Sequence, residues 1–264
     1  MSTGDGSTPT TEDPTGWMLD NSFSDFLLVS SKEIRYMCIF GYTIFHGHKV
    51  FSSLGPDSPP SLKFVSLLMA CFGGGIIVPI FLNIYPVPIA NDALTLGALV
   101  SFTIHHYFPI LREVINLSDI LKVVLVVLFE TLRAMVVVNF TSAAADKIPP
   151  SFFSFPLFGP IFCGTIAGCG GAFLPFNKGL DPIKKGLAPP MLTAAIGATM
   201  FHLFLNTPLF SEGCIDAKKK AHVHLAGFFI SIGVINALGL TAPPSKAAPV
   251  APPPKVVPVR RKKK

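Results

Sequence analysis

The sequence predicts an all-α membrane protein with seven transmembrane helices, arranged as two inverted three-helix repeats followed by a seventh helix. Three observations lead to this prediction: the chain is poor in charge, it contains seven long apolar stretches, and one glycine–proline motif occurs twice. Charged residues make up 14% of the 264 residues and the mean hydropathy is +0.56, whereas soluble domains carry about 25% charged residues. A soluble globular domain is excluded, because too few polar side chains remain to cover its surface in water.

The apolar stretches are the predicted helices. A helix rises about 1.5 Å per residue, so about 20 residues cross a hydrocarbon core of about 30 Å. The first stretch is the least apolar because Lys32, Glu33 and Arg35 lie near its start, and the fourth contains Glu130 and Arg133. In chain order, the seven stretches lie at residues 28–49, 64–84, 90–110, 118–140, 155–175, 188–209 and 222–241.

The ordered region is expected to be residues 28–241, with short connections rich in Pro, Gly, Asp and Ser. Residues 1–27 are mostly polar and acidic, and residues 242–264 are rich in Ala, Pro and Lys, so both ends are expected to be disordered. No cleavable signal peptide is predicted, because the start of the chain lacks an apolar core. The ordered region divides into a first repeat, a second repeat and a seventh helix, at residues 28–110, 118–209 and 222–241.

The positions of Lys and Arg predict the orientation of the chain, since these residues gather on the cytosolic side of membrane proteins. If the N-terminus is lumenal, Lys32, Lys147 and Lys218–Lys220 lie on the outer side. We therefore predict a lumenal N-terminus and a cytosolic C-terminus, with Lys218–Lys220 as a minor exception. Most other cations then lie on the inner side: Lys49, Lys63, Arg112, Lys122, Lys178, Lys184, Lys185 and those of the basic tail.

An internal repeat is visible in the apolar stretches. The motif Gly-Gly-x-x-x-Pro occurs at residues 74–79 in the second stretch and at 170–175 in the fifth. The third and sixth stretches share a Gly-Ala pair followed by a proline, and the first and fourth each carry a Glu and an Arg. Since three is odd, two copies of a three-helix unit have opposite orientations in the membrane, which indicates an inverted repeat.

Two interpretations of the repeated glycines remain open. Glycine and proline bend helices, and irregular backbone at membrane depth is tolerated where it lines a cavity or packs against protein. Matched breaks in two repeats indicate a pathway at the repeat interface, whereas small residues also allow close helix packing. The candidate breaks are Gly73, Gly74, Gly75, Gly168, Gly170 and Gly171.

Arg133 and Glu130 form the second candidate site. They are three residues apart and share a helix face, and Arg133 lies about 16 Å along the helix from Lys122. A charge at that depth is costly and marks a functional candidate. Arg133 is therefore either a cation facing a cavity, where it would attract a lipid phosphate or shape the passage of ions, or one half of an ion pair that holds the bundle together.

Other polar residues favour structural roles. His105, His106 and His202 have no second ligand at helical spacing, so packing is favoured over metal binding. No metal site, nucleic-acid surface or catalytic motif is predicted, and we do not expect an enzyme. Lys122 and its neighbours on the inner side are either topology-setting charges or ligands of an inositol-lipid head group.

The chain resembles the trimeric intracellular cation (TRIC) channel family, as an invertebrate-type member. The segments that carry the resemblance are Cys-Phe-Gly-Gly-Gly at 71–75, Phe-Glu-Thr-Leu-Arg at 129–133, Gly-Cys-Gly-Gly at 168–171 and the basic tail. The similarity covers residues 28–241. Phe129 departs from the family, which usually has Lys there, while Glu130 and Arg133 are kept. The Arg-Lys-Lys-Lys end resembles a dilysine retrieval signal of the endoplasmic reticulum.

This resemblance implies a function. It implies a homotrimer with one pore per subunit, lined by the first, second, fourth and fifth spans and shaped by the glycines. It also implies conduction of monovalent cations, chiefly K⁺ with Na⁺ as a further candidate, across endoplasmic or sarcoplasmic reticulum as a counter-ion current for Ca²⁺ release. A bound lipid, phosphatidylinositol 4,5-bisphosphate, would modulate the channel from the cytosolic side, held by Arg133 and Lys122 beside Phe129.

Two other classes of protein remain as alternatives. An alternating-access solute transporter would have parallel repeats with the extra span between them, whereas here the extra span follows both repeats. A non-conducting lipid-binding scaffold would use the glycines for packing and would have no cavity between the first, second, fourth and fifth spans.

Overall fold

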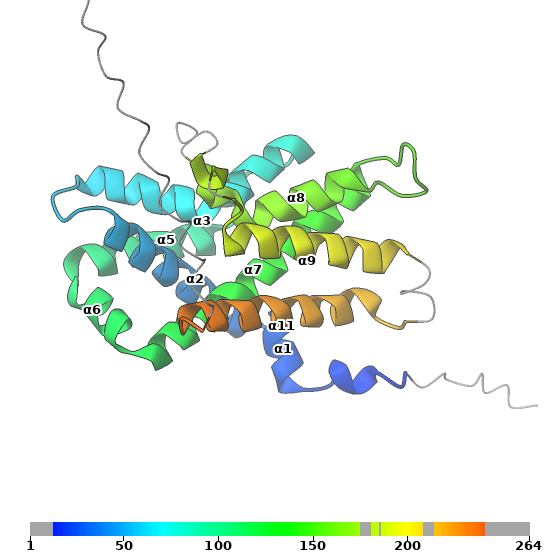
Figure 1. Ribbon diagram of the computed structural model, residues 1–264, viewed down its shortest axis with the longest axis horizontal. Helices are drawn as coiled ribbons and strands as arrows, with labels where there is room; N and C mark the ends of the chain where they lie inside the picture. The colour runs from blue at the N-terminus through cyan, green and yellow to red at the C-terminus, as the bar shows by residue number, and fades with distance from the viewer. Residues whose placement is uncertain (1–12, 175–180, 185, 208–213, 241–264) are drawn as a thin grey trace, which may run out of the picture.

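The structure, a computed structural model, describes residues 13–174, 181–184, 186–207 and 214–240. Over these residues the chain is built from helices, most of which lie side by side along the long axis of the molecule (Figure 1). The predicted tail at 242–264, residues 1–12 and the cations Lys178 and Lys185 lie outside the described residues. A helix occupies most of each of the seven predicted ranges, but the number of membrane crossings and the inverted relation of the repeats stay predictions.

The first predicted repeat folds as a cluster of helices in which α2 packs against both α3 and α5. The Ser31 side chain caps α2 by accepting a hydrogen bond from the Ile34 amide, and Asn91 caps α5 in the same way through Leu94. Ser101 and His105 of α5 bond to the Thr43 and Ile44 carbonyl oxygens of α2. The helices are α2 (Lys32–Ser53), α3 (Pro60–Leu82), α4 (Val87–Ala90) and α5 (Asp92–Tyr107).

The third predicted span ends in a sharp bend. Helix α5 and helix α6 (Ile110–Leu117) meet at 96°, where Pro109 disfavours helical backbone at Phe108. Judged by length and hydropathy, Pro60–Leu82 is the one described helix that would cross a bilayer by itself, and α5 with α6 would form another span only as a bent pair.

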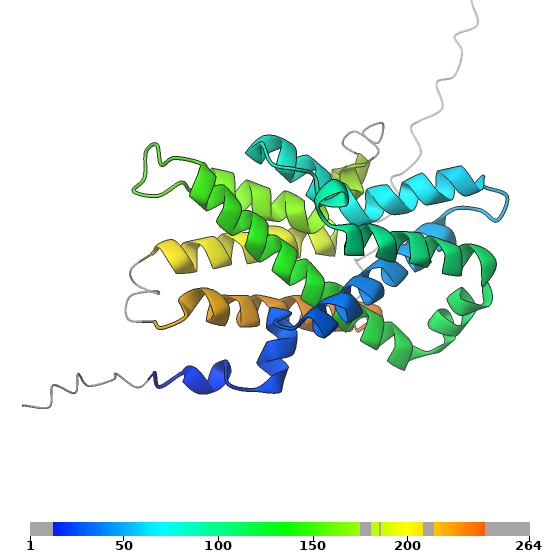
Figure 2. The same cartoon turned by 180° about the vertical axis from the view of Figure 1, so that it is seen from behind.

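Helix α7 (Asp119–Lys147) is the centre of the fold and packs against α2, α8, α9 and α11 (Figure 2). Its start is capped by the Ser118 side chain. Helix α8 packs on both α7 and α9, so the second predicted repeat also forms a cluster. The remaining elements are α8 (Phe158–Cys169), the 3₁₀ helices η2 (Gly170–Phe173) and η4 (Asp181–Ile183), α9 (Pro189–Asn206) and α11 (Ala217–Ala237).

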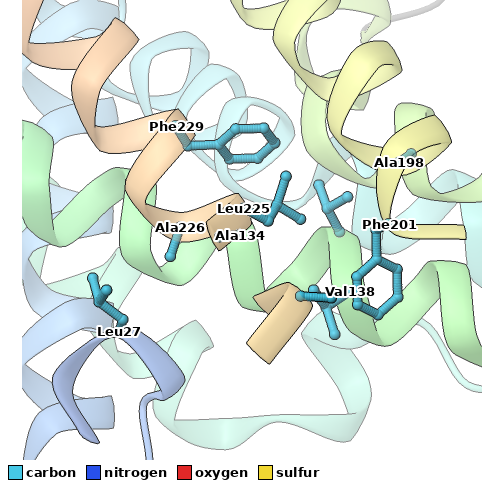
Figure 3. Packing of buried hydrophobic residues seen from close by; sticks show 10 residues of the cluster. Leu27, Ala134, Val138, Ala198, Phe201, Leu225, Ala226 and Phe229 are labelled. Atoms are coloured by element: carbon cyan, nitrogen blue, oxygen red, sulfur yellow. The ribbon is translucent and has the colours of Figure 1, made fainter. Parts of the chain in front are cut away.

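The largest apolar core joins α1, α7, α9 and α11 (Figure 3). Alanines on the three long helices let the backbones approach closely, and large side chains such as Phe201 and Phe229 fill the space beside them. Lipid tails are as apolar as these side chains, so within a membrane such a core stabilises the bundle by close packing rather than by exclusion of water.

The expected disorder of residues 1–27 is wrong for residues 13–27. This segment forms a 3₁₀ helix, η1 (Gly16–Met18), and helix α1 (Ser22–Leu28), whose Leu27 is buried in the core. Lys220 of α11 is only 3% exposed and pairs with the Asp13 carboxylate at 2.5 Å. The hydrogen bond from Lys220 lowers the pKa of Asp13 to about 2. The acidic segment thus compensates one cation of the outer group that opposes the predicted orientation.

The expected helix break at Gly73–Gly75 is also wrong, because α3 runs through these glycines and through Pro79. In the fifth stretch the α-helix ends at Cys169 and the chain continues as 3₁₀ helix η2, while Pro175 lies outside the described residues. The two glycine segments pack backbone against backbone. A Cβ atom at Gly73 would lie 2.3 Å from the Gly171 Cα atom, and one at Gly170 would lie 2.5 Å from the Gly74 nitrogen. Close approach between the two clusters therefore requires glycine here.

Candidate functional site

Two cavities lie where the helices of the two clusters meet. The first, which we call the central cavity, has a volume of about 380 Å³ and is bounded by α2, α3, α7, α8 with η2, and the start of α9. These include the four helices that correspond to the first, second, fourth and fifth predicted spans. Its lining includes Tyr42, His46, Lys49, Cys71, Gly74, Phe129, Arg133, Gly168, Cys169, Gly170 and Gly171.

The second, which we call the basic cavity, has a volume of about 440 Å³ and lies between α2, α6, α7, α11 and the start of α9. Three cationic or titratable side chains, those of His48, Lys49 and Lys122, line it together with Glu130. Lys49, Phe129 and Pro190 line both cavities, so they form the boundary between them.

Arg133 is buried at the wall of the central cavity, with 4% of its surface exposed. Its Nη1 donates to Glu130 at 2.6 Å, and its Nε donates to the Gly168 carbonyl oxygen at 2.8 Å. Its Nη2 donates to Thr193 at 2.9 Å and to the Pro190 carbonyl oxygen, and the guanidinium lies 4.4 Å from the Phe229 ring centroid. One side chain thus ties α7 to α8, α9 and α11.

Both interpretations of Arg133 have a structural basis. Glu130 is 7% exposed and compensates the guanidinium charge, as expected for an ion pair that holds a bundle together. Arg133 also lines the central cavity. Because protein oxygens already occupy donors on all three of its nitrogens, Arg133 can bind a phosphate fully only if it releases some of them.

Phe129 is enclosed by aromatic side chains of α2. Its ring stacks on Tyr42 with centroids 5.2 Å apart, and it lies 4.7 Å from Phe45 and 5.2 Å from His46. Tyr42 also donates a hydrogen bond to the Cys71 carbonyl oxygen of α3 at 2.9 Å. Phe129 therefore joins α2 to α7 by aromatic packing.

Lys122 lies in a different environment from Arg133. Its ammonium is 3.0 Å from Asp119, and both side chains of this pair are partly or largely exposed. Exposed pairs contribute little to stability, about 0–1 kcal/mol. Lys122 is therefore free to exchange its partner for a ligand in the basic cavity.

The candidate glycines serve packing and also line the cavity. Gly74, Gly168, Gly170 and Gly171 line the central cavity; Gly74, Gly170 and Gly171 lie at close backbone contacts, and Gly168 packs against the Val137 and Ala194 side chains. Gly73 contacts η2, and a Cβ atom at Gly75 would collide with the Val87 side chain, 2.8 Å away. The glycines bring the two helix clusters close together, and the central cavity remains open beside them.

The histidines singled out in the sequence lie away from both cavities. The Nε2 atoms of His105 and His202 are hydrogen-bonded to backbone carbonyl oxygens, and His106 stacks on Phe102. Within the described part of the chain, no three His, Cys, Asp or Glu side chains gather to hold a metal ion.

Sequence analysis missed the face of α2 that lines the cavities. Tyr42, Phe45, His46 and Lys49 follow the i, i+3, i+4, i+7 spacing of one helix face. An aromatic stripe that ends in a lysine within a predicted span was the available signal. The same spacing is also typical of a helix face that only packs against its neighbours, so the stripe alone does not identify a cavity wall.

The structure is similar to solved structures of trimeric intracellular cation channels. One from C. elegans, in the absence of Ca²⁺, matches with a TM-score of 0.61 and 19% sequence identity, over 81% of this chain and 95% of that chain. The C. elegans channel with bound Ca²⁺ has the same TM-score and identity, over 81% of this chain and 94% of that chain. A structure concerned with the activity of TRIC counter-ion channels in calcium release also has a TM-score of 0.61, with 18% identity over 86% of this chain and 98% of that chain.

No protein-family model matches the sequence, and no curated protein matches it significantly. The structural likeness confirms the resemblance drawn from the short motifs. The chain has the fold of the trimeric intracellular cation channels, an all-helical, multi-pass membrane fold.

We predict that Arg133→Ala lowers the free energy of unfolding in detergent micelles by about 3–5 kcal/mol, since it leaves the buried Glu130 carboxylate without its partner. The double variant Glu130→Gln/Arg133→Met is the control, because it removes both charges and keeps most of the volume. It should lose less stability than Arg133→Ala alone. An Arg133→Ala protein as stable as wild type, or a double variant that is less stable than the single one, would contradict the structural role of the pair.

Proposed function

We propose that this protein is a monovalent cation channel in which each subunit of a homotrimer conducts through its own central cavity. The observation that carries the proposal is this cavity, which is bounded by α2, α3, α7 and α8 at the junction of the two helix clusters. The fold supports the proposal because its solved relatives are trimeric intracellular cation channels. A lipid-binding scaffold would not need a cavity between these four helices.

The finer parts of the proposal follow from the same similarity. K⁺ is the expected main permeant ion and Na⁺ a second one. The expected location is the endoplasmic or sarcoplasmic reticulum, with the N-terminus lumenal and the C-terminus cytosolic. There the current would balance the charge that Ca²⁺ release moves across the membrane. One of the similar structures is of TRIC counter-ion channels that act in calcium release.

We predict that purified protein in planar lipid bilayers gives unitary K⁺ currents whose reversal potential follows the K⁺ gradient. Vesicles from a parallel purification without the protein are the control. The absence of K⁺ conductance at every voltage and lipid composition would contradict the proposal. Saturable solute uptake without unitary currents would indicate an alternating-access transporter instead.

We further propose that phosphatidylinositol 4,5-bisphosphate binds in the basic cavity. Support comes from His48, Lys49 and Lys122, which line this cavity on the predicted cytosolic side. Lys122 has only a weak exposed partner, whereas Arg133 is held by protein oxygens and Phe129 carries no charge. Lipid binding should therefore depend on Lys122 first, and on Arg133 only after it releases its internal partners.

The lipid proposal predicts that Lys122→Gln lowers the amount of this lipid retained after purification from vesicles by several-fold, because a charge-assisted contact to phosphate is lost. Retained lipid is measured by mass spectrometry. The control is Lys219→Gln, an exposed lysine at the other end of the bundle that pairs with Asp216, and it should retain as much lipid as wild type. Equal retention by all three proteins would refute the assignment of Lys122.

A further inference from the structure

Lys49 lies at the boundary between the central cavity and the basic cavity and lines both of them. Its Nζ atom lies 4.2 Å from the Phe45 ring centroid and 5.8 Å from that of Phe129. The ammonium is therefore held over aromatic faces, as in a cation–π contact. Lys49 belongs to α2, and although its ammonium lies near Phe129 of α7, the residue is exposed.

Lys49 shares its nearest acidic residue, Glu130, with Arg133. Among the described residues that line the two cavities, Glu130 is the acidic one, and it is paired with Arg133 at 2.6 Å. Lys122 has Asp119. Within the described chain, the Lys49 side chain makes no ion pair and no hydrogen bond, and its close contacts are with aromatic rings. Because Arg133 and Lys49 both lie near the single carboxylate of Glu130, one positive charge remains in excess where the cavities meet.

We propose that Lys49 is a tethered blocking cation that limits the passage of permeant cations between the basic cavity and the central cavity. The inference rests on the proposed channel function and names a residue that regulates it. A cation moving between the cavities passes the boundary formed by Lys49, Phe129 and Pro190. It meets a like charge at short range beside the rings of Phe45 and Phe129, and like charges repel. The rings of Phe45 and Phe129 keep the ammonium at this position.

Variants at position 49 distinguish an electrostatic block from a steric one. Gln and Glu side chains are nearly isosteric and differ in charge, whereas Lys is longer, so the comparison of Lys49→Gln with Lys49→Glu changes the charge with little change in volume. If the charge sets the barrier, the K⁺ conductance increases in the order wild type, Lys49→Gln, Lys49→Glu. If the side chain acts as a steric plug alone, Lys49→Gln and Lys49→Glu conduct equally.

The test is single-channel recording of wild type and the two variants in symmetric KCl. We expect Lys49→Gln to conduct at least about twofold more than wild type and Lys49→Glu to conduct more still, because each step removes positive charge from the path. The control is Lys32→Gln, at the opposite end of α2 and outside both cavity linings, and it should conduct as wild type does. Equal conductance of Lys49→Gln and Lys49→Glu, or the reverse order, would overturn the inference.

A second measurement tests the charge within a channel that already conducts. Lys49→Cys is placed in a background in which Cys71 and Cys169, which also line the central cavity, are serine. The 2-aminoethyl methanethiosulfonate reagent restores a positive charge at position 49, and the 2-sulfonatoethyl reagent adds a negative one. Only the first should reduce the K⁺ current. The same effect from both reagents would overturn the inference while the channel function stands. Silence of wild type and of every variant would overturn the channel function as well.

Discussion

The buried ion pair between Arg133 and Glu130 is the interaction on which the arrangement of the helices depends. A guanidinium inside an apolar bundle is stable only when its charge and its donors are compensated. Glu130 supplies the charge, and the Gly168 and Pro190 carbonyl oxygens and Thr193 supply acceptors from α8 and from the start of α9. Because these partners come from three helices, the pair sets how α8 and α9 lie against α7, and it thereby forms one wall of the central cavity.

A second contact, between α2 and α7, forms another part of the cavity lining. Phe129 packs among Tyr42, Phe45 and His46, and this aromatic cluster separates the central cavity from the basic one. Lys49 lies next to the cluster with its charge facing both cavities. The aromatic ring of Phe129 fits the stripe on α2 and leaves Lys49 as the cation at the boundary between the two cavities.

Local patterns in the sequence predicted the helices well, because hydropathy and caps depend on near neighbours. The apolar pattern located helix α7, and the resemblance of short motifs identified the fold. The order of residues 13–27 was missed because the ion-pair partner of Asp13 is Lys220, which lies near the other end of the sequence. The unbroken α3 was missed for a similar reason. The helical cost of its glycines is offset by backbone contacts with η2, whose closeness no local pattern reveals.

The candidate site depends even more on contacts between residues that are far apart in the sequence. The charge of Arg133 predicted a candidate residue, but three of its four oxygen partners come from α8 and the start of α9. Lys49 appeared in the sequence as a topology-setting charge, and its relevance arises only when Phe129 of another helix lies beside it.

The central claim is that ions pass through the cavity bounded by α2, α3, α7 and α8, and the native cysteines there allow a direct measurement. Cys71 and Cys169 line this cavity, whereas Cys214 lies elsewhere. A cationic methanethiosulfonate reagent applied during recording should permanently reduce the wild-type K⁺ current and leave the current of Cys71→Ala/Cys169→Ala unchanged, although Cys214 is still present. Equal inhibition of the two proteins, or inhibition of neither, would contradict this path for the ions.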